Sequence, residues 1–121
     1  MAATVTIYHN PRCSKSRETL ALIEGKGIEP KVVEYLKAPP SKEELRELLG
    51  KLGMKPGELV RKGEEVYKAS FAGKSMTDDQ WLDALSKNPV LIERPIVVKG
   101  AKAVLGRPPE NVLALLRQPK A

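Results

Sequence analysis

The chain has 121 residues, of which 41% are hydrophobic and only 4% aromatic, so a single domain with an aliphatic core is expected. Its 21 Lys and Arg residues against 15 Asp and Glu residues give a net charge of +6, which favours small oxyanions as partners. The lysines form no single cluster and aromatic residues are few, which argues against nucleic acid as a partner. No apolar run reaches the length of about 18 residues that a membrane span needs.

The single cysteine, Cys13, and the single histidine, His9, limit the redox and metal chemistry open to the chain. One cysteine cannot form an internal disulfide, and these two residues alone cannot form a His/Cys zinc site. The first residues enter a predicted strand directly, without a basic and then apolar leader. We therefore expect a cytoplasmic protein with no bound metal or cofactor.

The predicted elements begin with a strand–helix–strand unit. Residues 4–8 have the pattern of a strand, residues 15–26 that of a helix with Leu20, Leu22 and Ile23 toward the core, and residues 31–35 that of a second strand. A unit of this length joins two parallel strands.

Two capping boxes mark helices in the middle of the chain. Ser41-Lys42-Glu43-Glu44 opens a helix over 42–52, and Thr77-Asp78-Asp79-Gln80 opens a helix over 78–87. Between them, Pro56 begins a short helix, and residues 63–76 mix short helix and loop.

The last third of the chain predicts a hairpin and a helix. Residues 94–105 are two short apolar runs about a turn at Gly100, and Pro108 begins a helix whose buried side chains are Val112, Leu113, Leu115 and Leu116. The element order is that of an α/β, thioredoxin-like fold with a mixed four-stranded sheet. We predict one domain over residues 1–121 with a helical insertion at about 41–88.

Cys13 lies where the first strand gives way to the first helix. A helix N-terminus carries unpaired N–H groups and roughly half a positive charge, and Arg12, Lys15 and Arg17 add cations beside it. Such surroundings lower the pKa of a cysteine well below its ordinary value and also hold an oxyanion. We interpret Cys13 as an activated nucleophile; the alternative is a small, buried apolar side chain.

The residues after Cys13 exclude two kinds of cysteine chemistry. Ser16 stands where a C-x-x-C pair has its second cysteine, so an outside thiol must resolve any adduct on Cys13. A tyrosine-phosphatase loop needs an arginine six residues after the cysteine, whereas Arg17 comes four residues after Cys13.

Three arginines and two residues before the cysteine are further candidates for a site. Arginine suits tetrahedral oxyanions because its planar fork donates two parallel hydrogen bonds, although each arginine alone is also explained as a surface cation. His9 either supplies positive charge or a hydrogen bond to the thiolate, or caps the strand end, and Asn10 can bond the loop backbone. The arginines are Arg61, Arg94 and Arg107.

Six segments together resemble the glutaredoxin-linked arsenate reductase family over about residues 4–117. The segments are Ile7-Tyr8-His9-Asn10-Pro11-x-Cys13-x-x-Ser16-Arg17, Glu34-Tyr35-Leu36-x-x-Pro39-Pro40, Leu59-x-Arg61-Lys62, Asp78-Asp79-Gln80, Arg94-Pro95-Ile96-Val97-Val98 and Arg107-Pro108.

The resemblance implies a thioredoxin-like fold with inserted helices and a reaction on arsenate. In that reaction Cys13 attacks arsenic, glutathione enters as a co-substrate, arsenite leaves, and glutaredoxin removes the mixed disulfide. It further implies that Arg61, Arg94 and Arg107 bind the anion and that His9 helps to keep the thiolate. Pro95 corresponds to the family's cis proline, and Asn10, Ser16 and Arg17 belong to the matching cysteine loop.

Three residues depart from the family pattern, and the sequence leaves two alternative functions. Ser14-Lys15 replaces a Gly-Thr pair after the cysteine, and Gly106 replaces a frequent cysteine. One alternative is a glutathione-dependent thiol oxidoreductase acting on another substrate. The other is a non-enzymatic regulator that binds RNA polymerase, as a related branch does, although Ser16 removes the C-x-x-C switch that several of those proteins use.

Overall fold

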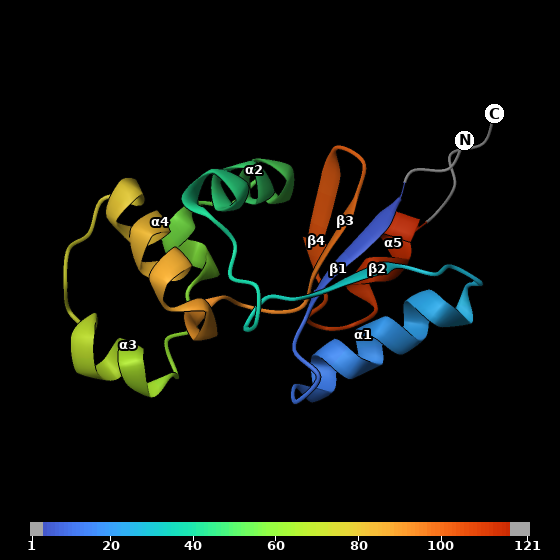
Figure 1. The fold of residues 1–121 in the computed structure, drawn as a ribbon, viewed down its shortest axis with the longest axis horizontal. Helices are drawn as coiled ribbons and strands as arrows, with labels where there is room; N and C mark the ends of the chain where they lie inside the picture. The colour runs from blue at the N-terminus through green and yellow to red at the C-terminus, as the bar shows by residue number, and fades with distance from the viewer. Residues whose placement is uncertain (1–3, 117–121) are drawn as a thin grey trace. The chain divides into compact units, whose positions relative to one another are not determined.

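The computed structural model describes residues 4–116, which contain a mixed four-stranded sheet in the order β2-β1-β3-β4 (Figure 1). β1 (Val5–His9) pairs in parallel with β2 (Lys31–Glu34) and antiparallel with β3 (Ile96–Lys99). β3 pairs antiparallel with β4 (Lys102–Leu105) across the predicted hairpin. The predicted α/β, thioredoxin-like fold is confirmed.

The chain forms two compact units, and the sheet belongs to the first, made of residues 4–35 and 94–116. Alternation along β1 buries every second side chain, so Val5 and Ile7 enter the core together. α1 (Ser14–Gly25) and α5 (Asn111–Leu116) supply the other side of that core. Each fully buried aliphatic side chain contributes about 1.5–3 kcal/mol. The core cluster consists of Val5, Ile7, Ile23, Val97, Val112 and Leu116.

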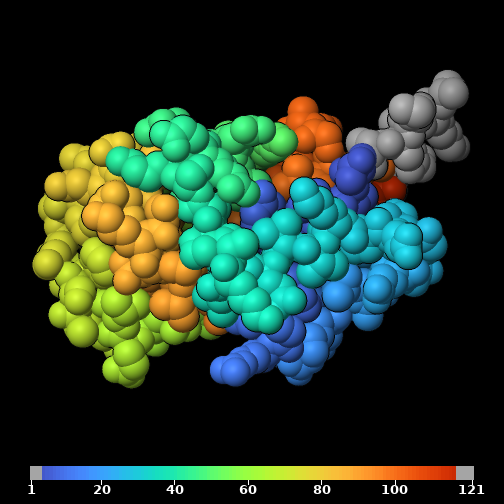
Figure 2. Space-filling view, viewed as in Figure 1, coloured from blue at the N-terminus to red at the C-terminus, as the bar shows by residue number. Residues whose placement is uncertain are grey.

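β2 is an edge strand of this sheet, and its atoms (cyan) lie on the surface that faces the viewer in Figure 2. Val32 is 43% exposed, and the strand carries Lys31 at one end and Glu34 at the other. Charges and short length are common features of edge strands because they discourage pairing with another chain.

The second unit, residues 36–93, is helical and contains the predicted insertion. The side chain of Ser41 accepts a hydrogen bond from the N–H of Glu44, and Thr77 and Gln80 cap each other's backbone N–H groups, as predicted. α2 and α4 contact each other through buried leucines. The elements are α2 (Lys42–Leu52), η1 (Pro56–Leu59), α3 (Glu65–Ser70), α4 (Asp78–Lys87) and η2 (Pro89–Leu91).

Two details of the helices differ from the predictions. The last helix begins at Asn111 rather than Pro108, because residues 108–110 form a turn in which Pro108 O accepts the N–H of Asn111. α1 buries the polar Ser16 and Thr19 as well as the predicted Ile23, and the predicted Leu20 and Leu22 pack against the core but are only partly buried. Among residues 4–116, no helix has the length and apolar character needed to cross a membrane.

Candidate active site around Cys13

Cys13 is the N-cap residue of α1 and is partly exposed. Its backbone is extended, with φ −92° and ψ 122°, and its N–H donates to Asn10 O at 3.0 Å. Its own carbonyl accepts the N–H of Arg17 at 3.0 Å, which begins the helix. The thiol therefore lies beside the unpaired N–H groups of the first helical turn, where a thiolate or an oxyanion is stabilised.

A buried hydrogen-bond network holds the loop before Cys13. Ser16 is fully buried, and its hydroxyl accepts the N–H of Asn10 at 3.0 Å and lies 2.6 Å from Nδ1 of His9. Asn10 Oδ1 in turn accepts the N–H of Arg12 at 3.0 Å, and Nη1 of Arg17 donates to Pro11 O at 2.9 Å. The structure thus places His9, which was predicted to be catalytic, and the predicted supporting residues Asn10, Ser16 and Arg17 in one hydrogen-bonded loop.

The pKa of the Cys13 thiol lies below its ordinary value. Partial burial acts to raise this pKa, but the backbone N–H groups of Ser16 and Lys15 and the guanidinium of Arg94 together outweigh it. The helix N-terminus therefore has the effect on the thiol that the sequence predicts.

His9 has a role different from a simple positive charge. Burial lowers the pKa of its imidazole, Glu34 opposes this shift, and Arg17 adds to it, so the ring is neutral at neutral pH. Its hydrogen bond goes to Ser16, one of the groups that fix the loop. Any influence of His9 on the thiolate is therefore transmitted through the geometry of the loop.

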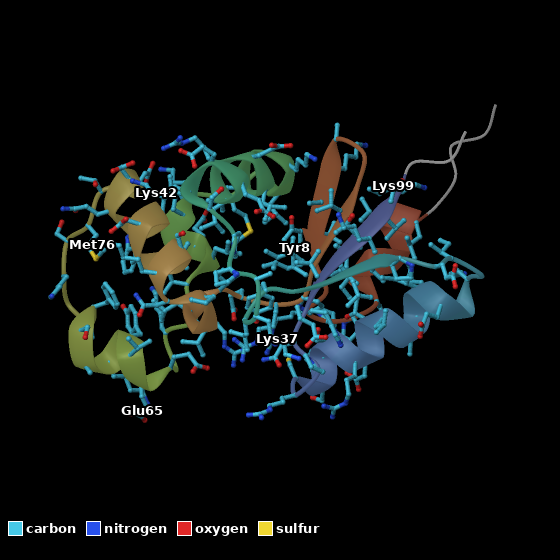
Figure 3. All side chains as sticks on the ribbon, viewed as in Figure 1. Tyr8, Lys37, Lys42, Glu65, Met76 and Lys99 are labelled. Atoms are coloured by element: carbon cyan, nitrogen blue, oxygen red, sulfur yellow. The ribbon has the colours of Figure 1, made fainter. Side chains whose placement is uncertain are left out.

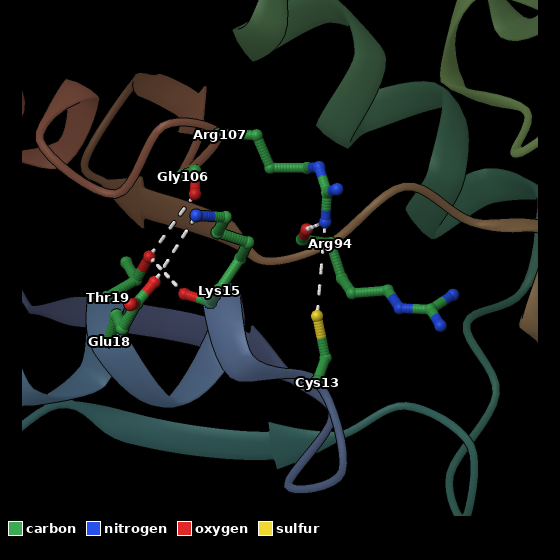
Figure 4. A network of polar contacts seen from close by, with 7 residues as sticks. All are labelled: Cys13, Lys15, Glu18, Thr19, Arg94, Gly106 and Arg107. Atoms are coloured by element: carbon green, nitrogen blue, oxygen red, sulfur yellow. Dashed lines mark hydrogen bonds and ion pairs between the residues drawn. The ribbon is translucent and has the colours of Figure 1, made fainter.

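Arg94 precedes the hairpin and Arg107 follows it, and both residues lie near Cys13 (Figure 4). Nη1 of Arg107 lies 3.9 Å from the sulfur of Cys13 and donates to Arg94 O at 3.3 Å. Arg94 is buried, with 8% of its surface exposed, and lowers the pKa of Cys13. The structure thus brings a nucleophilic sulfur and two guanidinium groups together.

Two Arg–Pro peptide bonds flank the hairpin, and both are cis. The Arg94–Pro95 bond agrees with the expectation for Pro95 that follows from the resemblance. The Arg107–Pro108 bond was not predicted, because a proline alone is a weak signal for the cis form.

Arg61 belongs to the second unit, where it is held by two carboxylates. Its Nε lies 3.3 Å from Glu64 and 3.7 Å from Glu93, and its backbone N–H donates to Leu91 O at 2.7 Å. Within residues 4–116, its buried Nη1 has no hydrogen-bond partner. The convergence of Arg61 with Arg94 and Arg107 stays a prediction.

Thr19 lies next to the site and was not predicted from the sequence, which singled out Gly106 only as a departure from the family pattern. Thr19 is fully buried, and its hydroxyl contacts Lys15 O and Gly106 O. One signal was available in the sequence. Ser16, Thr19 and Ile23 are spaced as one face of a helix, and polar side chains on a face that packs against the core need hydrogen-bond partners.

Positive charge is concentrated in the unit that holds Cys13. Residues 4–35 and 94–116 include nine Lys and Arg against five Glu, whereas residues 36–93 include ten basic and ten acidic residues. An excess of one sign attracts oppositely charged ligands, so anions are drawn toward the first unit.

A cavity of about 620 Å³ lies in the second unit, and no cysteine lines it. Lys42 and Met76, labelled in Figure 3, are among its lining residues. Its charged groups largely pair with one another, Lys42 with Asp79 and Lys87 with Asp83, each at 3.0 Å. The candidate active site is therefore the surroundings of Cys13 rather than this cavity.

Comparison with known proteins agrees with the fold and the cysteine loop. The sequence profile of the ArsC family matches residues 8–115, nearly the whole chain. The chain belongs to the ArsC family. This ArsC chain is 50% identical over 118 residues to the uncharacterized protein YfgD of Escherichia coli strain K12, an alignment that covers 96% of the chain and 99% of the relative.

Two further relatives of the ArsC chain carry a named activity. The arsenate reductase of Haemophilus influenzae is 46% identical over 115 residues, covering 93% of this chain and 99% of its own. The solved structure of an arsenate reductase from Vibrio cholerae superposes with a TM-score of 0.91 at 51% identity, covering 96% of this chain and 100% of that one.

The lowered pKa of Cys13 predicts the pH dependence of its alkylation. Iodoacetamide reacts with the thiolate, so the rate should rise around a midpoint below that of glutathione, and Cys13 should react faster than glutathione near pH 7. His9→Ala should raise this midpoint by loosening the loop. A midpoint equal to that of glutathione would contradict activation, whereas an unchanged midpoint in His9→Ala would contradict only the role of His9.

Proposed function

We propose that this ArsC chain is an arsenate reductase that uses the Cys13 thiolate as nucleophile and glutathione and glutaredoxin as reductants. The observation that carries the proposal is the placement of a thiol of lowered pKa beside Arg94 and Arg107 at a helix N-terminus. This combination suits attack on a tetrahedral oxyanion, since the guanidinium groups offset its charge. Two relatives are arsenate reductases, which favours arsenate as the oxyanion.

The first step forms a bond between the sulfur of Cys13 and arsenic(V). The thiolate displaces one arsenate oxygen, which takes up protons and leaves as water. Arg94 and Arg107 hold the remaining oxygens, which keep their negative charge, and the N–H groups at the start of α1 add further donors.

The second step needs a thiol from outside the chain because the sequence has one cysteine. The glutathione thiolate attacks the sulfur of Cys13, the sulfur–arsenic bond breaks, and its electron pair stays on arsenic, which leaves as arsenite. Two thiols are oxidised to one disulfide while arsenic(V) is reduced to arsenic(III). Glutaredoxin then attacks the glutathione sulfur of this mixed disulfide and frees Cys13. A reducing cytoplasm, where glutathione is abundant, suits this cycle.

A coupled assay tests the proposal directly. Purified protein with glutathione, glutaredoxin and glutathione reductase should consume NADPH when arsenate is added, and consumption should stop when glutathione is omitted. Consumption that does not depend on arsenate would favour a thiol oxidoreductase with another substrate. No consumption at all would favour a non-enzymatic role, and turnover with thioredoxin alone would refute the glutathione step.

A further inference from the structure

We propose that Thr19 is a positioning residue that holds Arg107 at the sulfur of Cys13. The inference rests on the proposed function, because its consequence is tighter binding of an oxyanion between Cys13 and Arg107. Thr19 contacts neither the thiol nor Arg107; it acts through the backbone of Gly106, the residue before Arg107 (Figure 4).

The hydroxyl of Thr19 joins two segments of the site. Its single hydrogen is shared between two acceptors, Lys15 O at 2.7 Å, one turn earlier in α1, and Gly106 O at 3.3 Å, just after β4. Both contacts lie within the first unit, and Thr19 itself is fully buried. A buried hydroxyl in this position ties the helical turn that follows Cys13 to the segment that carries Arg107.

Gly106 fits this contact because it has no side chain. A Cβ at position 106 would lie 2.6 Å from Oγ1 of Thr19, 2.9 Å from its Cγ2 and 2.8 Å from Cγ of Pro95. Atoms at these distances overlap, so any larger residue would push the segment away from α1. The backbone of Gly106 is also fixed on its other side, since its N–H donates to Pro95 O at 2.9 Å.

Arg107 takes its position from this fixed backbone. Its carbonyl accepts from Nδ2 of Asn111 at 3.2 Å, and its Nη1 donates to Arg94 O at 3.3 Å. The guanidinium is otherwise exposed and lies only 3.9 Å from the sulfur of Cys13. A small displacement of Gly106 is therefore passed to the guanidinium, and displacements near 1 Å cost catalytic and binding energy.

The thiolate of Cys13 is stabilised by the N–H groups of Ser16 and Lys15 and by Arg94, which lower its pKa, and the guanidinium of Arg107 lies 3.9 Å from the sulfur. A change that acts by displacing Arg107 should weaken anion binding only while the guanidinium of Arg107 is present. A change that loosens the start of α1 should weaken anion binding whether or not this guanidinium is present. This difference separates positioning of Arg107 from a general structural role.

Protection of Cys13 from iodoacetamide by added arsenate, phosphate or sulfate measures anion binding without turnover. In Thr19→Val, which keeps the shape and loses the hydroxyl, the anion concentration that halves the alkylation rate should rise roughly 2- to 10-fold, the range for one lost hydrogen bond. Thr19→Ser, which keeps the hydroxyl, should bind anion more tightly than Thr19→Val.

A double-mutant cycle with Arg107→Ala shows whether Thr19 acts through Arg107. In the Arg107→Ala background, Thr19→Val should cause no further loss of protection, because the group that it positions is gone. Thr77→Val is the matched control: it removes a threonine hydrogen bond at the start of α4, in the second unit, and should leave protection unchanged.

The outcomes are distinct from those of the proposed function. Equal losses of anion protection from Thr19→Val with and without Arg107 would overturn the role of Thr19. Wild-type protein protected by phosphate or sulfate but inactive on arsenate would overturn the proposed function and still test Thr19 with those anions. Wild-type protein that none of the three anions protects would overturn both.

Discussion

Cys13→Ser is expected to reduce arsenate-dependent NADPH consumption to the level measured without the protein. A serine hydroxyl stays protonated near neutral pH and cannot form either the sulfur–arsenic bond or the mixed disulfide, so a loss of roughly 1000-fold or more is expected. The side chain is partly exposed and makes few core contacts, so the midpoint of thermal unfolding should stay close to that of the wild type. The same coupled assay and a thermal melt measure both quantities.

Mass spectrometry supplies the control for this prediction. Wild-type protein turned over with arsenate and glutathione, but without glutaredoxin, should accumulate glutathione on the peptide that contains Cys13, and Cys13→Ser should not. Retained activity in Cys13→Ser, or glutathione attached nowhere in stalled wild-type protein, would contradict the proposed chemistry. Ser16→Ala is not a neutral comparison, because Ser16 is fully buried and bonds both His9 and Asn10.

Arg94→Lys and Arg107→Lys form the second prediction, since each keeps the charge and removes the two-pronged donor. Each should lower kcat/KM for arsenate about 10- to 100-fold, the range for a lost hydrogen bond to a charged group. Arg94→Lys should also raise the alkylation midpoint of Cys13, because the side-chain hydrogen bond from Arg94 lowers this pKa.

Arg46→Lys is the matched control for the arginine variants. Arg46 is an exposed arginine on α2 whose partner is Asp79 at 3.5 Å, and surface ion pairs of this kind contribute little. Its kcat/KM should equal that of the wild type. Wild-type kcat/KM in both Arg94→Lys and Arg107→Lys would remove the anion site from the proposed function.

Arg61→Lys tests the prediction that Arg61 belongs to the anion site. If Arg61 joins the anion site, as the resemblance implies, its unpartnered Nη1 becomes a donor to the oxyanion and the variant should lose kcat/KM as the other two do. A variant with wild-type kcat/KM would exclude Arg61 from the site.

Local sequence signals determined most of the elements. Ser41 and Thr77 start their helices because a side chain caps N–H groups three residues away, an interaction complete within a few residues. Cys13 was recognisable for the same reason, since a strand followed by a helix defines the position of the helix N-terminus. The partial positive charge at that helix N-terminus acts on the thiol independently of the rest of the fold.

Only the tertiary structure decided which polar residues of α1 are buried and which distant residues reach the thiol. The sequence placed Leu20, Leu22 and Ile23 toward the core, where they pack, but α1 also buries Ser16 and Thr19, because the loop and the segment after β4 supply their polar partners. The sequence marked Gly106 only as a departure from the family pattern, because the atoms that exclude a side chain there come from Thr19 and Pro95. Burial and close packing depend on contacts between segments far apart in the chain, and residue spacing along one segment does not contain that information.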